Sequence, residues 1–113
     1  MPDPADAYFI PAGGGSRHEI FPGVNIRTIA GTRLMFSVVN LDDGAIVAEH
    51  SHPHEQMGLL ISGHLEFTIG GITRLLEPGD LWRIPGGVPH HVVAVGGPAV
   101  ALDCFDPIRE DYL

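Results

Sequence analysis

The feature that most constrains the fold of this chain is the even spacing of its glycines and prolines. The 113 residues include 15 Gly and 10 Pro, and the segments between them are short runs rich in Val, Ile, Leu, Phe and Thr. No window of a dozen residues carries a 3.6-residue apolar period free of Gly or Pro, so any helix is limited to a short turn. Many short apolar runs bounded by turn residues predict an all-β sandwich or barrel.

The runs can be placed individually along the chain. The predicted strands cover residues 24–29, 34–41, 45–50, 57–61, 65–69, 73–76, 81–84, 91–95 and 99–105. Gly70-Gly71 stands between two alternating runs and predicts a tight hairpin. Residues 1–16 are rich in Pro and Gly and are expected to form a flexible arm, in which Tyr8–Ile10 could add a strand to a sheet edge. Residues 17–113 are expected to form one domain.

The charge balance argues against several classes of partner. Asp and Glu number 14 against 6 Lys and Arg, a net charge of −8, and the basic residues do not cluster. Such a chain is expected to bind neither nucleic acid nor an anionic membrane. A small anionic substrate remains compatible, because a metal ion or one buried Arg sets the local field. The N-terminus lacks the basic and apolar segments of a secretory signal, so we expect a cytoplasmic protein.

Three histidines and one glutamine have the spacing of a metal site. His50 and His52 are two positions apart, which on a regular strand puts both imidazoles on one face about 7 Å apart. An isolated pair of this kind can equally be a solvated surface feature. Here the pair belongs to Gly44-x5-His50-x-His52-x3-Gln56-x6-Gly63, and a second stretch runs Gly79-x5-Pro85-x-Gly87-x2-His90. Together they offer three imidazoles and a carboxamide.

These two stretches resemble the two motifs of the cupin superfamily. Every glycine, proline and histidine of both motifs has a counterpart, in residues 44–63 and 79–94. The 15 residues between Gly63 and Gly79 match the shortest spacing between the motifs in that superfamily. The resemblance implies a single-domain jelly-roll barrel (a double-stranded β-helix).

The resemblance also implies one divalent metal ion held by His50, His52, Gln56 and His90. Gln56 stands where Glu is usual, and Ala94 stands where Asn is usual but often missing. A neutral Gln oxygen leaves the ion its full +2 charge, which makes it a stronger Lewis acid. Zn, Ni, Mn, Co and Fe(II) all suit this ligand set. The alternative is a cupin with an empty pocket.

The other histidines have less specific positions. His91 follows His90 directly and is expected on the opposite face of the strand. His54 shares the parity of His50 and His52, but Pro53 disturbs the strand between them. His18 is expected to be solvated.

Asp103 interrupts the apolar run 99–105 and can be interpreted in two ways. Ala101, Asp103 and Phe105 share one face of this predicted strand. An unpaired buried carboxylate is costly, which favours the solvent side. In the other interpretation, the Asp103 side chain points into the pocket, where it acts as an acid or base beside the metal. The residues alone leave both open.

The tail 103–113 supports the second interpretation through a narrower resemblance. It is similar to the tail of the small pectin-degradation (KdgF-type) cupins, which also share this length, the run His-Ser-His-Pro-His-Glu-Gln at 50–56, and a Gln ligand. The resemblance implies that Asp103, Phe105 and Arg109 are the catalytic residues. It further implies conversion of 4,5-unsaturated monouronates to 5-keto-4-deoxyuronates. Asp103 would carry the proton, Arg109 would clamp the carboxylate, and Phe105 would shape the apolar wall.

Other functions fit the same motifs. Some cupins are metal-dependent dioxygenases, and others isomerise or cyclise different enolisable substrates. A sugar-binding module without catalysis belongs to a separate class, and many small cupins of unproven activity share this tail. Because edge strands need covering, a homodimer is expected.

Overall fold

The computed structural model describes residues 3–113, which form ten β-strands and two short 3-10 turns. The strands are β1 (Ser16–Phe21), β2 (Val24–Ala30), β3 (Met35–Leu41), β4 (Ile46–His50), β5 (Glu55–Ser62), β6 (Leu65–Ile69), β7 (Ile72–Leu76), β8 (Leu81–Ile84), β9 (His90–Ala94) and β10 (Ala99–Asp106). The turns are η1 (Pro4–Ala7) and η2 (Glu110–Tyr112). No helix within residues 3–113 is long and apolar enough to cross a membrane.

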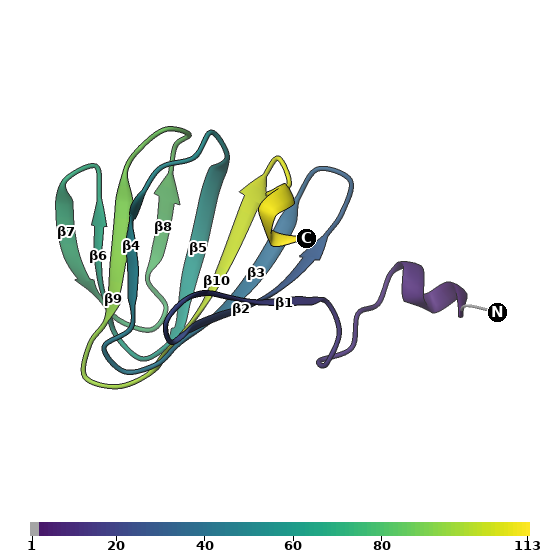
Figure 1. Ribbon diagram of the computed structural model, residues 1–113, viewed down its shortest axis with the longest axis horizontal. Helices are drawn as coiled ribbons and strands as arrows, with labels where there is room; N and C mark the ends of the chain where they lie inside the picture. The colour runs from purple at the N-terminus through teal and green to yellow at the C-terminus, as the bar shows by residue number, and fades with distance from the viewer. Residues whose placement is uncertain (1–2) are drawn as a thin grey trace.

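The strands make two antiparallel sheets that face each other (Figure 1). One sheet has the order β1-β2-β3-β10-β5-β8 and the other β4-β9-β6-β7. The core lies between them, with Leu60 and Ile84 from the larger sheet and Leu65 and Phe67 from the smaller one. This arrangement confirms the predicted all-β sandwich or barrel.

Strand β10 lies between β3 and β5, in the middle of the larger sheet. Its residues alternate between buried and half-buried along the whole strand. Ala101, Asp103 and Phe105 are on the buried side, as the predicted alternation requires. A buried strand with neighbours on both sides gives its inward residues a fixed position relative to the opposite sheet.

The predicted hairpin at Gly70-Gly71 is confirmed. Ile69 pairs with Ile72 across the turn, so Gly70 and Gly71 form a two-residue loop. Their φ angles are 56° and 79°. A two-residue turn with positive φ at both positions matches the right-handed twist of the flanking strands, and glycine adopts it without strain.

The sequence prediction missed β1. This edge strand pairs only with β2, and none of its residues is fully buried. Because its first four residues, 16–19, are polar, the strand lacks the apolar run that marks the other strands. His18, expected to be solvated, is in β1, and its Nε2 lies 3.0 Å from the Tyr112 carbonyl oxygen.

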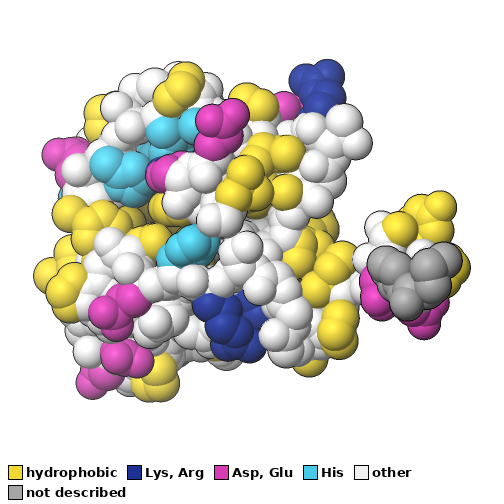
Figure 2. Space-filling view, turned by 45° about the vertical axis from the view of Figure 1, so that its right-hand side comes forward, with side chains coloured by type: hydrophobic (Ala, Val, Ile, Leu, Met, Phe, Trp, Pro, Cys, Tyr) yellow, Lys and Arg dark blue, Asp and Glu magenta, His cyan; other side chains and the backbone are white. Residues whose placement is uncertain are grey.

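The predicted N-terminal arm extends away from the sheets (Figures 1 and 2). Met1 and Pro2 lie outside the described residues. Tyr8 and Phe9 are 81% and 72% exposed, and residues 8–10 form no strand. The sheet edge is therefore not extended by this segment within the single chain.

Candidate metal centre

Three histidines converge at one end of the smaller sheet. His50 ends β4 and pairs with His90, the first residue of β9, and His52 follows two residues after β4. Their ligand atoms all lie within 4.8 Å of one another. The ring centroids of His50 and His90 are 4.4 Å apart, and those of His52 and His90 are 5.0 Å apart. Figure 2 shows several histidine side chains (cyan) on one face of the molecule.

Backbone carbonyls orient the three imidazoles. The Nδ1 atoms of His50, His52 and His90 contact the carbonyl oxygens of Ala48, His54 and Val88 at 2.8, 3.1 and 2.9 Å. A carbonyl only accepts, so a donating Nδ1–H leaves the lone pair of Nε2 free. His90 Nε2 is buried and has no hydrogen-bond partner among residues 3–113. Such an orientation is typical of histidines that bind a metal through Nε2.

Burial favours the neutral form of two of these imidazoles. It lowers the pKa of His90 to about 4, with smaller lowering contributions from the neighbouring imidazoles and Arg109. Burial also lowers the pKa of His52, and the charge of Arg109 lowers it further. A neutral imidazole is the form that coordinates a metal ion.

Gln56 faces His52 in a way that suits a cation between them. Its Oε1 lies 3.0 Å from His52 Nε2, while His52 Nδ1 contacts the His54 carbonyl. A neutral ring carries one proton and cannot donate to both oxygens. One of the two contacts is therefore between two lone pairs, which repel each other. A cation bound to both Nε2 and Oε1 would remove this repulsion. The donor set of three imidazoles and an amide oxygen fits a divalent transition metal.

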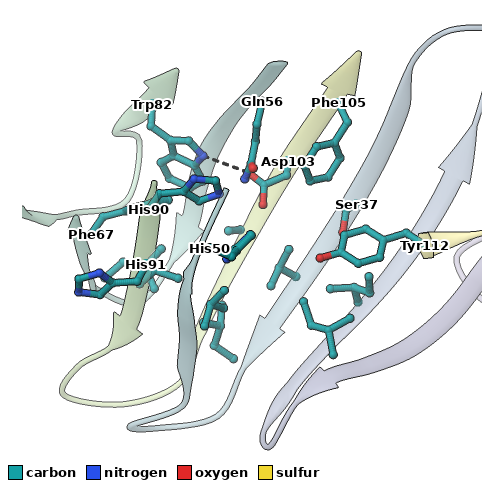
Figure 3. A pocket seen from close by; sticks show the side chains of 18 of the residues that line it. Ser37, His50, Gln56, Phe67, Trp82, His90, His91, Asp103, Phe105 and Tyr112 are labelled. Atoms are coloured by element: carbon teal, nitrogen blue, oxygen red, sulfur yellow. Dashed lines mark hydrogen bonds between the residues drawn. The ribbon is translucent and has the colours of Figure 1, made fainter. Parts of the chain in front are cut away.

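Asp103 lies beside this group, on the inner side of β10. Its Oδ1 accepts a hydrogen bond of 3.0 Å from the Trp82 indole N–H, and the residue is 9% exposed (Figure 3). Burial raises the pKa of Asp103 to about 6, against lowering effects from Gln56, Trp82 and the Arg109 charge. The interpretation that placed Asp103 in solvent is wrong. A carboxyl with this pKa can both take and return a proton near neutral pH.

Phe105 and Arg109 line the same cavity as Asp103. The Phe105 ring meets the His52 ring edge-on, with centroids 5.8 Å apart. Arg109 Cζ lies 3.9 Å from the centroid of the Tyr112 ring, and Nη2 donates to Asp111 at 3.0 Å. The buried guanidinium brings positive charge to the cavity, and most of its N–H donors are not used by Asp111.

Two histidines contribute differently from the three that converge. The His54 ring lines a separate surface depression with Arg33 and Pro107. It touches the site only through His52, by an edge-on ring contact with centroids 5.4 Å apart and by its carbonyl oxygen, 3.1 Å from His52 Nδ1. His91 is half-buried, and Figure 3 draws it pointing away from His90. The expected opposite orientation of His91 is therefore found.

Sequence reasoning missed Trp82, which reaches Asp103 across Gly58. Gly58 pairs with Trp82 on β8 and with Asp103 on β10. A Cβ atom at Gly58 would lie 2.2 Å from Trp82 Cε2, so only glycine lets the indole lie across β5. A lone glycine inside a strand is a known sign of close approach, and it was the available signal.

The family model and the solved structures that match this chain point to one family. The model of the cupin domain family matches residues 37–105. KdgF from Halomonas sp. is 31% identical over 93% of this chain and 97% of its own, with a TM-score of 0.84. An RmlC-like cupin from Shewanella frigidimarina is 25% identical over 94% of this chain and 96% of its own, with a TM-score of 0.86.

A third similar structure is longer than this chain. It is a variant of oxalate decarboxylase from Bacillus subtilis, 26% identical with a TM-score of 0.80. The match covers 92% of this chain but only 30% of the decarboxylase. No curated protein matches the sequence.

Proposed function

The chain belongs to the cupin family, and from that premise we propose that it is a metal-dependent, non-redox enzyme that linearises 4,5-unsaturated monouronates to 5-keto-4-deoxyuronates. The main support is the position of the buried Asp103 carboxyl beside the three-histidine cluster. Arg109, which is positively charged, lines the same cavity. The similarity to KdgF over nearly the whole chain supports it.

His50, His52, His90 and Gln56 would hold one divalent ion. The ion would supply Lewis-acid stabilisation of negative charge on a substrate oxygen. Zn, Ni, Mn, Co and Fe(II) suit the donor set. A solved structure of the similar oxalate decarboxylase concerns its Mn(II) centres, which supports including manganese among the ions to test.

Asp103, Arg109 and Phe105 are the proposed catalytic residues. Asp103 takes the proton of the C1 hydroxyl as C1=O forms and the C1–O5 bond breaks. The electron pair of that bond becomes an enolate over O5, C5 and C4, and a proton returned to C4 completes the isomerisation with no atom gained or lost. Arg109 binds the substrate carboxylate. Phe105 and the apolar wall keep water from the open intermediate.

The test uses protein loaded in turn with Zn, Ni, Mn or Fe(II) and a 4,5-unsaturated galacturonate monomer. Loss of the conjugated enol-ether absorbance is followed with and without oxygen. We expect metal-dependent loss that is indifferent to oxygen and yields the 5-keto product, and Asp103→Asn should abolish it while keeping the metal content. Loss at the spontaneous rate, or a wild-type rate in Asp103→Asn, overturns the proposal. An oxygen-dependent rate favours a dioxygenase instead.

We also propose that the protein is a cytoplasmic homodimer. The outer face of the larger sheet supports the dimer. Phe36 on β3 and Met57 on β5 both pair with Cys104 on β10, and their side chains are 48% and 53% exposed. Contiguous apolar side chains on a sheet face are typical of an interaction surface.

A further inference from the structure

A polar row crosses the inner face of the larger sheet. Thr28 pairs with Ser37, Ser37 with Asp103, Asp103 with Gly58, and Gly58 with Trp82, so five neighbouring strands contribute one residue each. Directly opposed residues of antiparallel strands project from the same face. The four side chains of this row are all buried. Three of the five residues, Ser37, Asp103 and Trp82, line the cavity that the histidines line.

Within this row, only the Ser37 hydroxyl is unused. Thr28 Oγ1 donates to the Tyr112 carbonyl oxygen at 2.6 Å, and Trp82 donates to Asp103. Ser37 is 1% exposed, and its Oγ has no hydrogen-bond partner among residues 3–113. A buried hydroxyl without a partner destabilises a fold, and alanine would fill the position without that cost. Folding alone therefore gives no reason for a serine here.

A second hydroxyl, that of Tyr112, enters the same cavity. Tyr112 belongs to η2, and its carbonyl oxygen is held by Thr28 and lies 3.0 Å from His18 Nε2. Arg109 stacks on the Tyr112 ring. Figure 3 shows the Tyr112 ring with its hydroxyl directed into the cavity that Ser37 also lines. The contacts of the C-terminal turn thus hold Tyr112 in the same cavity as the unused hydroxyl.

We propose that Ser37 and Tyr112 form a hydroxyl-binding subsite that selects a polyhydroxylated carboxylate over a plain carboxylate of the same charge. The inference rests on the proposed function and names the residues that set its specificity. Each hydroxyl both donates and accepts, which matches a sugar hydroxyl, whereas the Arg109 guanidinium only donates and matches a carboxylate. Ser37 and Asp103 are direct cross-strand neighbours, so a ring hydroxyl held by Ser37 lies beside the proposed proton carrier.

The subsite and the histidines belong to one cavity. Ser37 Oγ and His90 Nε2 are both shielded from solvent, and both residues line that cavity. A ligand bound at the histidines therefore lies in the same enclosed space as Ser37.

The test measures binding and does not depend on turnover. Zn-loaded wild type, Ser37→Ala and Tyr112→Phe are titrated in a calorimeter with D-galacturonate and with tetrahydropyran-2-carboxylate, which keeps the ring and the carboxylate but has no hydroxyls. Thr68→Val is the matched control, since Thr68 is a buried Thr on β6 whose hydroxyl pairs with Thr73 outside the cavity.

We expect wild type to bind galacturonate more tightly than the hydroxyl-free acid. Ser37→Ala and Tyr112→Phe should each weaken galacturonate binding by about tenfold, the loss typical of one hydrogen bond. Binding of the hydroxyl-free acid should not change. Thr68→Val should leave both affinities at the wild-type value. The melting temperature of Ser37→Ala should equal or exceed that of wild type, because an unpartnered buried hydroxyl has been removed.

The outcomes separate this inference from the proposed function. Equal galacturonate affinity in wild type and Ser37→Ala overturns the subsite, and turnover of the unsaturated uronate by the same protein leaves the function standing. Galacturonate binding that depends on Ser37, without turnover of the unsaturated substrate, overturns the function and keeps the subsite. No binding of galacturonate by wild type overturns the subsite.

Discussion

The indole N–H of Trp82 donates to Asp103 Oδ1 at 3.0 Å, although the two residues are on strands separated by β5. The contact is possible because Gly58 on β5 has no side chain between them. One oxygen of the proposed proton carrier is thereby fixed, and its orientation depends on the Trp82 indole and on the absence of a side chain at Gly58.

Trp82→Phe is expected to lower turnover of the unsaturated uronate without loss of metal. Phenylalanine keeps a ring against Phe67 but removes the N–H. A hydrogen bond to a charged group contributes about 1.5–3 kcal/mol, so kcat should fall about tenfold to a hundredfold while KM changes little. Steady-state kinetics and metal analysis check this. Phe67→Leu alters the same packing without touching the hydrogen bond and should retain most of kcat.

Gly58→Ala is expected to displace the indole. The new Cβ would lie 2.2 Å from Trp82 Cε2, while the backbone at Gly58 is one that alanine can adopt. Overpacking of this kind destabilises by about 1–3 kcal/mol, and turnover should fall with the lost contact to Asp103. Denaturant unfolding measures the first effect. Gly13→Ala, where a Cβ meets nothing within 4 Å, should match wild type, and equal stability of the two variants would contradict the prediction.

Adjacent histidines offer a matched test of the metal centre. His90→Ala removes a proposed ligand and should reduce bound metal from one ion per chain to nearly none. His91→Ala should retain it, because His91 points away from the cluster. In wild type, a free metal concentration of 100 times Kd should stabilise the fold by about 2.7 kcal/mol, and a chelator should reverse the shift. Elemental analysis and thermal unfolding supply the readouts, and loss of metal in both variants would argue against the assignment.

Gln56→Glu is expected to separate metal binding from turnover. The variant keeps an oxygen facing His52 and adds a negative charge, which favours the bound cation. In the wild type, the Gln56 amide beside Asp103 lowers the pKa of that carboxyl. The substitution replaces this amide with a second carboxylate. We expect metal affinity at least equal to that of wild type and turnover at least about tenfold lower. Wild-type turnover in Gln56→Glu would show that the neutral ligand is not required.

Phe36→Lys is expected to convert the proposed dimer to a monomer. The substitution places a charge in the middle of the apolar outer face, beside Cys104. A buried unpaired charge at an interface is strongly unfavourable. Light scattering should give the mass of two chains for wild type and one for the variant, with turnover unchanged. A wild-type mass of one chain would contradict the proposed dimer.

Residue pattern alone was enough to predict most of the strands, the Gly70-Gly71 hairpin and the spacing of the three histidines. These features are local, because side-chain alternation and turn geometry act over a few neighbouring residues. Which face of β10 is buried, and so the position of Asp103, depends on how the two sheets pack. The same packing brings Trp82, Ser37 and Tyr112 into the cavity with Asp103. Those neighbours depend on the pairing of strands far apart in the chain, such as Ser37 with Asp103, and pairing register is fixed only when both sheets close over a common core.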